Sequence, residues 1–223
     1  MSQRAGWFAW LIFMIGALYF ILPLFGTFVF SLQKVRGSLG FSAYEAAFAN
    51  PDFLQTFLFS SLIAALTIVT SLALIVPTAF WVNLRMPRWR GVVEFITLLP
   101  FVIPAIVLVF GIIRTFGKPV TLFGVPLLPS LLNTELSTNI VLIAAYTVLS
   151  LPYMYRATDN GLRAMDVRTL AEAAQSLGAN WFTVLMRVIL PNLRTALLSG
   201  ALLTFAIVIG EYTIAAFLAR PMF

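Results

Sequence analysis

The stretch TLAEAAQSLGANW, residues 169–181, is polar and rich in small side chains, although long apolar segments stand on both sides of it. Thr169 and Glu172 have the spacing of a capping box, in which the Thr169 hydroxyl accepts from the Glu172 amide and the Glu172 carboxylate accepts from the Thr169 amide. Gly178 follows about two turns later and predicts a left-handed C-cap, because glycine adopts that conformation without steric cost. The stretch therefore predicts a short, capped helix.

A second helix is predicted directly after the first. Asn180 is a suitable N-cap for the segment WFTVLMRVIL, residues 181–190. Pro191 has no backbone N–H, so it is expected to end this helix or to kink it into the apolar segment that follows. Residues 156–191 are thus predicted to form a helix–glycine–helix connection that enters an apolar span at a proline.

The composition of the whole chain excludes a soluble domain. Of its 223 residues, 61% are hydrophobic and 10% are charged, and the mean hydropathy is +0.99. Soluble domains average about 25% charged residues, so an integral membrane protein is predicted. The net charge of +6 does not indicate a nucleic-acid partner, since the basic residues lie between apolar runs, where they act as topology signals.

The residue types also limit the possible chemistry. The chain contains no cysteine and no histidine, which excludes thiol catalysis, disulfides, Cys/His metal sites and histidine acid–base chemistry. Its eight acidic residues are scattered, with no close pair suited to hydrolysis. No catalytic residue and no metal site is predicted, and the chain is not expected to be an enzyme.

Five segments are apolar enough to cross a bilayer as helices, which takes roughly 20 residues. They are residues 7–32, 53–82, 91–113, 138–155 and 192–219. The predicted fold class is all-α, a polytopic helical bundle that forms a single transmembrane domain over residues 1–223. Pro152 is expected to break the fourth span, and Pro100 and Pro104 are expected to break the third. The breaks in the third span either line a pathway or act as a hinge, or they are only packing kinks.

The distribution of lysine and arginine predicts the orientation. With a cytoplasmic N-terminus, nine basic residues lie inside and five outside. The inside set is Arg4, Arg85, Arg88, Arg90, Arg156, Arg163, Arg168, Arg187 and Arg194, and the outside set is Lys34, Arg36, Arg114, Lys118 and Arg220. The positive-inside rule therefore predicts a cytoplasmic N-terminus and places residues 156–191 in the cytoplasm.

The stretch EAAQSLGANWFTVLMRVILP, residues 172–191, resembles the EAA motif of permease subunits of binding-protein-dependent ABC importers. That motif reads Glu-Ala-Ala, three residues, Gly, nine residues, Ile, one residue and Leu-Pro. The residues that match in spacing are Glu172, Ala173, Ala174, Gly178, Leu190 and Pro191. Val188 stands where the family usually has isoleucine. The resemblance implies the MetI-like permease fold, in which one further span is expected after Phe223.

The resemblance also implies partners and a mechanism. The partners are two ATP-binding subunits, a second permease subunit, a periplasmic or lipid-anchored solute-binding protein and the lipid bilayer of the cell inner membrane. ATP is bound by the partner subunits, and the chain itself takes no cofactor. The EAA helix rests in a groove of each ATPase, whose closure swings the spans from inward-open to outward-open. Glu172 then transmits force by capping and contact, and Gly178 by the bend.

From the residues alone, the 169–181 helix has two interpretations. Ala171, Ala173 and Ala174 make it thin, so that a cytoplasmic partner can approach its backbone closely. Alternatively, it is a helical loop packed on its own bundle. The resemblance favours the docking interpretation.

Glu211 is the one acid deep in an apolar run, LLTFAIVIGEYTIAAFLA, residues 202–219. It would lie about 29 Å along a helix that starts near Asn192, at about 1.5 Å per residue. A carboxylate there would attract a cationic substrate into the pathway, or would form only interfacial or interhelical hydrogen bonds. The segment GEYTIAAFL resembles permeases of the spermidine/putrescine group, which implies a polyamine or another small cation. Permeases for ferric ion, thiamine and phosphonate are the alternatives.

Two other classes of function are weaker. A self-sufficient channel or secondary transporter should show an acid cluster near the midplane or an internal inverted repeat, and neither is visible. An intramembrane enzyme would lack obvious reactive groups. The segment GIIRTFGKP, residues 111–119, departs from the spacing of a phosphate-binding loop, so the chain is not expected to bind ATP itself.

Overall fold

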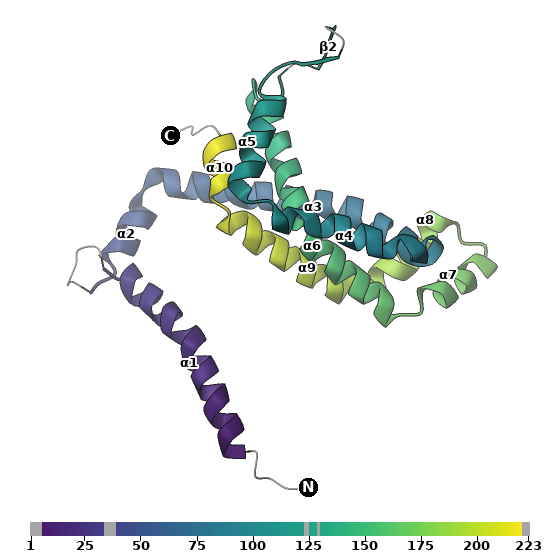
Figure 1. The fold of residues 1–223 in the computed structure, drawn as a ribbon, viewed down its shortest axis with the longest axis horizontal. Coiled ribbons are helices and arrows are strands. Elements are labelled where there is room, and N and C mark those ends of the chain that lie inside the picture. Colours follow the sequence, from purple (N-terminus) through teal and green to yellow (C-terminus); the bar gives the residue numbers. More distant parts are fainter. Residues whose placement is uncertain (1–5, 34–38, 123–124, 129, 220–223) are drawn as a thin grey trace. The chain divides into compact units, whose positions relative to one another are not determined.

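The computed structural model describes residues 6–33, 39–122, 125–128 and 130–219. These residues are mostly helical, with one β-hairpin and one isolated bridge (Figure 1). Four members of the charge count, Arg4, Lys34, Arg36 and Arg220, lie outside the described residues. The chain divides into two compact units, Met1–Leu58 and Phe59–Phe223, whose boundary falls within one long helix.

The first unit contains α1 (Gly6–Ser31), α2 (Ser42–Ala49) and the start of α3 (Pro51–Arg85). Helix α1 is apolar all round and has no buried residue, which is typical of a helix that faces lipid. The Ser31 and Tyr44 hydroxyls form a 2.6 Å hydrogen bond that links the end of α1 to α2. The predicted first span, 7–32, corresponds to α1.

The second unit continues α3 and adds the remaining elements. They are the 3₁₀ turn η2 (Pro87–Trp89), α4 (Arg90–Val102), α5 (Ala105–Phe116), the antiparallel strands β1 (Val120–Leu122) and β2 (Val125–Leu128), α6 (Glu135–Ala164), α7 (Val167–Ser176), α8 (Trp181–Thr183), the π-helical segment η3 (Val184–Ile189), α9 (Leu190–Gly210) and α10 (Thr213–Leu218).

Within the described residues, four helices are long and apolar enough to cross a membrane: α1, α3, α6 and the continuous helix Trp181–Gly210. A fifth span is formed if α4 and α5 count as one, although the axis bends by 96° between them. The bend lies at Ile103, which has extended backbone because the following Pro104 disfavours the helical conformation. The predicted break at Pro104 is confirmed, whereas Pro100 stays inside α4.

The prediction that Pro152 breaks the fourth span is wrong. Helix α6 has 30 residues and passes through Pro152, so residues 156–164 belong to this helix and not to the connection that follows. Pro152 and its neighbours Met154 and Tyr155 are buried. Packing against other helices keeps a membrane helix continuous through a proline, and the sequence pattern does not reveal such packing.

Two boundaries of the fifth predicted span also differ. Pro191 does not end the preceding helix, because the π-helical segment η3 directly before it lets the chain continue into α9. The span then ends at Gly210 and not at residue 219, since Glu211 takes extended backbone and the short helix α10 follows.

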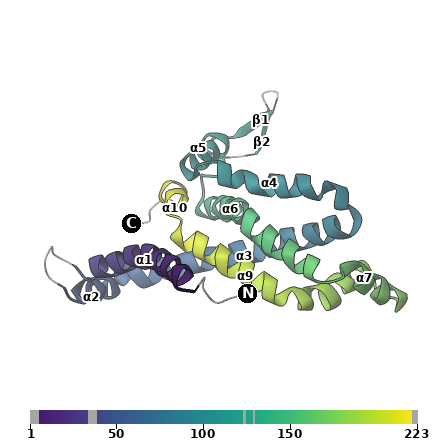
Figure 2. The same cartoon turned by 60° about the horizontal axis from the view of Figure 1, so that its bottom comes forward.

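Helices α6 and α9 run side by side and form the most extensive helix–helix contact of the second unit (Figures 1 and 2). Glycines set their spacing. A Cβ added at Gly161 would lie 2.7 Å from Ala196 Cβ and 2.7 Å from Leu193 Cδ2, and one at Gly200 would lie 2.9 Å from Met154 Sδ. Small residues let membrane helices approach each other closely in this way.

Replacing Gly161 by alanine is therefore expected to destabilise the protein by roughly 1–3 kcal/mol, the usual cost of an over-packed contact. The midpoint of thermal unfolding in detergent measures the effect. The matched control is Gly111→Ala in α5, where the new methyl group would meet nothing within 4 Å. Its midpoint should stay unchanged or rise, and an equal result for both variants would show that α6 and α9 have room to separate.

Candidate functional site

Helix α7 begins at Val167, and its cap is Asp166, not Thr169. The Asp166 carboxylate accepts hydrogen bonds from the Thr169 hydroxyl at 2.6 Å and from the Thr169 amide at 3.2 Å. These bonds lower the pKa of the Asp166 carboxyl below its ordinary value. The Glu172 carboxylate instead accepts from Arg168 Nε at 2.9 Å. The predicted capping box is wrong, because Asp166 and not Thr169 is the cap. The charged Asp166 carboxylate is a stronger hydrogen-bond acceptor than a hydroxyl.

The C-terminal end of α7 agrees with the prediction. Gly178 has a φ of +82°, in the left-handed region. The Gly178 amide donates to the Gln175 carbonyl at 2.8 Å, and the Ala179 amide donates to the Ala174 carbonyl at 3.1 Å. This pair of hydrogen bonds is the Schellman motif, which stops the helix and reverses the chain. The predicted cap at Asn180 is also confirmed, since its Oδ1 accepts from the Thr183 amide at 2.8 Å.

The two faces of α7 have different surroundings. Val167 and Ala171 are buried in a hydrophobic cluster that also contains residues of α3, α6, η3 and α9. Glu172 and Ala173 are exposed on the other face. Leu177, directly before the reversing glycine, is 90% exposed. The inner face thus packs on its own bundle, as one interpretation of the sequence held, while the outer face touches none of the other described elements closely.

The six motif residues lie at both ends of one connection. Glu172, Ala173, Ala174 and Gly178 belong to α7 and its cap, and Leu190 and Pro191 begin α9. Helix α7 packs against η3, the segment that joins these two groups. Ala174 and Leu190 are partly buried against the same hydrophobic cluster. The structure therefore places the motif residues on α7 with its cap and on the start of α9, which α8 and η3 join at one end of the bundle (Figure 1).

Trp181 attaches this unit to α3. Its ring lies 5.7 Å from the Trp81 ring, edge to face, and 6.5 Å from the Phe80 ring. The guanidinium carbon of Arg85 stands 5.0 Å from the centre of the Trp181 ring. Aromatic and cation–π contacts of this kind hold a helix end in a fixed position.

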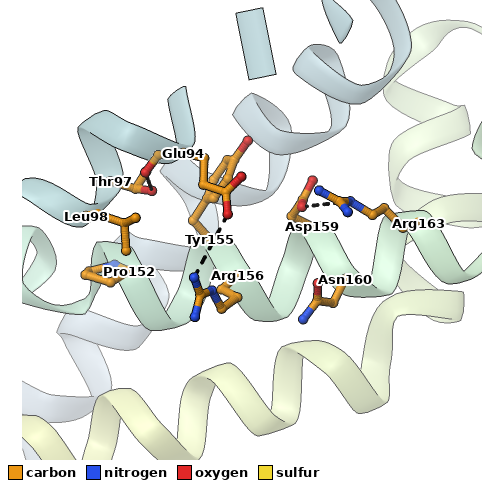
Figure 3. Close-up of a pocket in the computed structure, with 9 residues that line it drawn as sticks. All are labelled: Glu94, Thr97, Leu98, Pro152, Tyr155, Arg156, Asp159, Asn160 and Arg163. Carbon is orange, nitrogen blue, oxygen red and sulfur yellow. Dashed lines mark hydrogen bonds and ion pairs between the residues drawn. The ribbon is translucent and has the colours of Figure 1, made fainter. Parts of the chain in front are cut away.

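A buried carboxylate near the start of the connection was not identified from the sequence. Asp159 of α6 is 4% exposed and accepts hydrogen bonds from Asn83 of α3 at 2.9 Å and from Arg90 of α4. It also forms an ion pair with Arg163 of α6 at 3.2 Å (Figure 3). The one local signal is the four-residue spacing of Asp159 and Arg163, which favours a helical ion pair. The other two partners are 76 and 69 residues away.

Glu211 lies at the break between α9 and α10. Its carboxylate accepts from the Thr213 amide at 3.0 Å and from the Ile214 amide at 2.7 Å, and so caps α10. The Tyr146 hydroxyl donates to the Glu211 carbonyl at 3.5 Å. The side chain is partly buried and engaged with backbone, which differs from a carboxylate on a continuous helix facing a pathway. A role in the substrate pathway stays a prediction.

Comparison with known proteins agrees with the motif. Residues 75–222 match the family described as binding-protein-dependent transport system inner membrane component. A probable molybdenum ABC transporter permease protein of Haloferax volcanii is 30% identical over 199 residues, which are 87% of this chain and 67% of the relative. The spermidine/putrescine transport system permease protein PotB of Haemophilus influenzae is 28% identical over 175 residues, 74% of this chain and 59% of the relative.

A third relative is the molybdenum transport system permease protein ModB of Azotobacter vinelandii, 30% identical over 156 residues, with 67% of this chain and 66% of the relative covered. The chain therefore spans between about three fifths and two thirds of the length of these curated relatives. The predicted family and the all-α polytopic fold are confirmed. This chain belongs to the binding-protein-dependent transport system inner membrane components, the multi-pass permease subunits of ABC importers.

Proposed function

We propose that this chain forms part of the transmembrane pathway of an ATP-driven importer and that α7 is the element on which a partner ATP-binding subunit docks. The observation that carries the proposal is the division of α7 into a packed face and an exposed face. Val167 and Ala171 fix the helix to the bundle, while Glu172, Ala173 and Leu177 stay accessible. A helix held in this way can transmit a push and still present a surface to a partner.

In this proposal, a push on α7 passes through its two connections along the chain. Asp166 follows the end of α6 after one residue, and Gly178 leads through α8 and η3 into α9. Because α6 and α9 are in close contact at Gly161 and Gly200, both helices would move together. The bond from Asp159 to Arg90 would carry the movement to α4, whose axis bends by 96° into α5. In this proposal, the contacts already present between α6 and α9 and between Asp159 and Arg90 are sufficient to pass the movement of α7 to the spans.

The same end of the bundle is proposed to face the cytoplasm, with the N-terminus on that side. Arginines of four helices, α3, α4, α6 and α7, gather there. Arg85 lies over Trp181, Arg90 and Arg163 share Asp159, and Arg168 pairs with Glu172 on α7. This concentration of positive charge is what the positive-inside rule expects of cytoplasmic connections.

For the substrate, the relatives suggest two chemical classes. One is a polyamine or another small cation, as for the spermidine/putrescine permease. The other is a tetrahedral oxyanion, as for the molybdenum permeases and the probable sulfate permease protein of Chlorella vulgaris. Glu211 carried the cation prediction, but its carboxylate already accepts two amides of α10. We therefore favour an oxyanion and retain a polyamine, ferric ion, thiamine or phosphonate as alternatives.

The docking proposal predicts a large effect at Leu177. Replacing this leucine by aspartate removes an apolar side chain that would be buried in the ATPase groove, where burial contributes about 1.5–3 kcal/mol. Association with the ATP-binding subunit should weaken by roughly 10- to 100-fold. The measurement is the stoichiometry of the ATP-binding subunit that co-purifies with the tagged permease at limiting concentration.

The matched control is Leu136→Asp, at the first turn of α6, where the leucine is 73% exposed and far along the chain from the connection. This variant should retain the full complement of ATP-binding subunit. Equal recovery of the partner with both variants would remove Leu177 from the docking surface, and absence of any stoichiometric ATP-binding subunit from the unmodified complex would refute the proposed function.

A further inference from the structure

A small polar cavity lies between α4 and α6, close to the start of the α7 connection (Figure 3). Its volume is about 100 Å³, and it is lined by three residues of α4 and six of α6. Most of the lining side chains are polar or charged, among them Arg156, Asn160 and Arg163 of α6 and Glu94 of α4. A cavity of this kind between two membrane helices is expected to hold water or a polar ligand.

Three hydrogen-bond donors on α6 share one side of the helix. Arg156, Asn160 and Arg163 are four and three residues apart, a spacing that places them on the same face. Arg163 forms an ion pair with Asp159 through Nε at 3.2 Å, and its side chain is half exposed. Arg156 has only a 4.0 Å contact between its Nη2 and Glu94 Oε1. Both guanidinium groups can therefore still bind an anion with two parallel N–H bonds.

Two buried donors beside these arginines are unpaired. Tyr155 is one of the residues that line the cavity, it is 3% exposed, and its buried hydroxyl has no hydrogen-bond partner among the described residues. Arg90 Nε is likewise buried and unpaired in that part of the chain. Buried donors without a partner are rare in native proteins and point to a missing acceptor.

The balance of charge also favours an anion. Arg156 and Arg163 line the cavity together with Glu94 and Asp159, and Arg90, which does not line it, neutralises Asp159 through an ion pair. Asp159 already accepts hydrogen bonds from Asn83 and Arg90 and forms an ion pair with Arg163, which leaves it little capacity for a cation. Glu94 is the one carboxylate of this group that a cation could bind, and Arg156 stands next to it.

We propose that this cavity binds one tetrahedral oxyanion, such as sulfate or molybdate, between the guanidinium groups of Arg156 and Arg163. The inference rests on the proposed transport function. It names the class of substrate and places a binding site for it at the α7 end of the bundle. Arg156 would exchange its long contact with Glu94 for the anion, and Asn160 would supply a further donor. The cavity has the volume of roughly three water molecules, which suits a five-atom ion and not an extended polyamine chain.

The test uses the complete transporter, permease with ATP-binding subunits, in phosphatidylcholine nanodiscs. Sodium molybdate or sodium sulfate is titrated against sodium chloride of equal ionic strength, and the thermal unfolding midpoint of the permease is followed. We expect a saturable rise with the oxyanions and none with chloride, since a ligand that binds only the folded state stabilises it. Arg156→Gln and Arg163→Gln should each raise the half-saturating concentration tenfold or more.

Control and contrasting variants make the outcomes distinct. Arg114→Gln on α5 removes an exposed arginine outside the cavity and should leave the titration unchanged. If Arg156→Gln does not fold, Arg156→Lys keeps the charge without the two-pronged geometry and should give an intermediate concentration. A rise produced by putrescine and lost in Glu94→Gln would overturn the proposal in favour of a cation site, and no response to any oxyanion would overturn it as well.

A lipid phosphate is the second possible source of the same chemistry. Nanodiscs that contain phosphatidylglycerol distinguish it, because a headgroup bound at this site would raise the midpoint without added salt and compete with free molybdate. A rise in such nanodiscs that both glutamine variants abolish would support the oxyanion site with lipid as its occupant. The stoichiometry of the co-purified ATP-binding subunit reports on the proposed transport function independently of every one of these titrations.

Discussion

Gly178→Val is expected to leave membrane insertion intact and to abolish transport. Gly178 has a φ of +82°, and a Cβ at this position would meet nothing within 4 Å. The substitution therefore acts on the backbone alone, where the left-handed conformation costs a branched residue roughly 1–3 kcal/mol. Relief of that strain would open the Schellman hydrogen bonds of Gly178 and Ala179. Helix α7 would then lose its fixed position against η3.

The measurement is substrate uptake and ATP hydrolysis in proteoliposomes, with the solute-binding protein supplied. Uptake should fall below about one tenth of the unmodified level, the loss that a coupling free energy of about 1.4 kcal/mol represents. Hydrolysis should continue without stimulation by the binding protein. Gly178→Asn is the control, because asparagine tolerates the left-handed conformation and should retain most of the uptake. Normal uptake by the valine variant would show that this bend has no role in coupling.

Asp159→Ala is expected to be the most destabilising single substitution in the second unit. It leaves Arg90 and Asn83 without their shared acceptor at the junction of α3, α4 and α6. Loss of one partner of a buried ion pair costs about 3–5 kcal/mol. For a protein of this size that corresponds to a decrease of roughly 10 °C in the unfolding midpoint. The midpoint in detergent, followed by circular dichroism, measures it.

A second substitution separates a lost ion pair from a general packing defect. In the double variant Arg90→Leu, Asp159→Leu, no charge of the buried pair remains, and such replacements are often neutral or stabilising. The double variant should therefore unfold at a higher temperature than Asp159→Ala. A midpoint as low as that of the single variant would show that the helices at this junction depend on packing and not on the carboxylate.

The elements that the sequence predicted well are those controlled by neighbouring residues. A left-handed glycine at 178 and an asparagine cap at 180 depend on the local chain, and both are present. Pro104 ends α4 because it acts on the residue directly before it. The EAA motif also depends on local spacing, and it identified the family that the comparisons confirm.

The predictions that failed depend on contacts that the sequence pattern does not contain. Pro152 lies inside α6 because buried neighbours support the helix there. Thr169 is not the cap of α7 because Asp166 competes for the same amide. Asp159 could not be identified as a buried junction, since Asn83 and Arg90 belong to helices more than sixty residues away. The cavity of α4 and α6 depends on the same packing.

The position of the outer face of α7 in the assembled transporter tests the central claim most directly. The chain contains no cysteine, so Ala173→Cys gives this permease a single thiol on the exposed face of α7. A thiol-reactive photo-crosslinker at residue 173 should yield one product with the combined mass of the permease and an ATP-binding subunit, and Leu136→Cys should not. No product with the ATP-binding subunit at residue 173, from a complex that hydrolyses ATP, would contradict docking through α7.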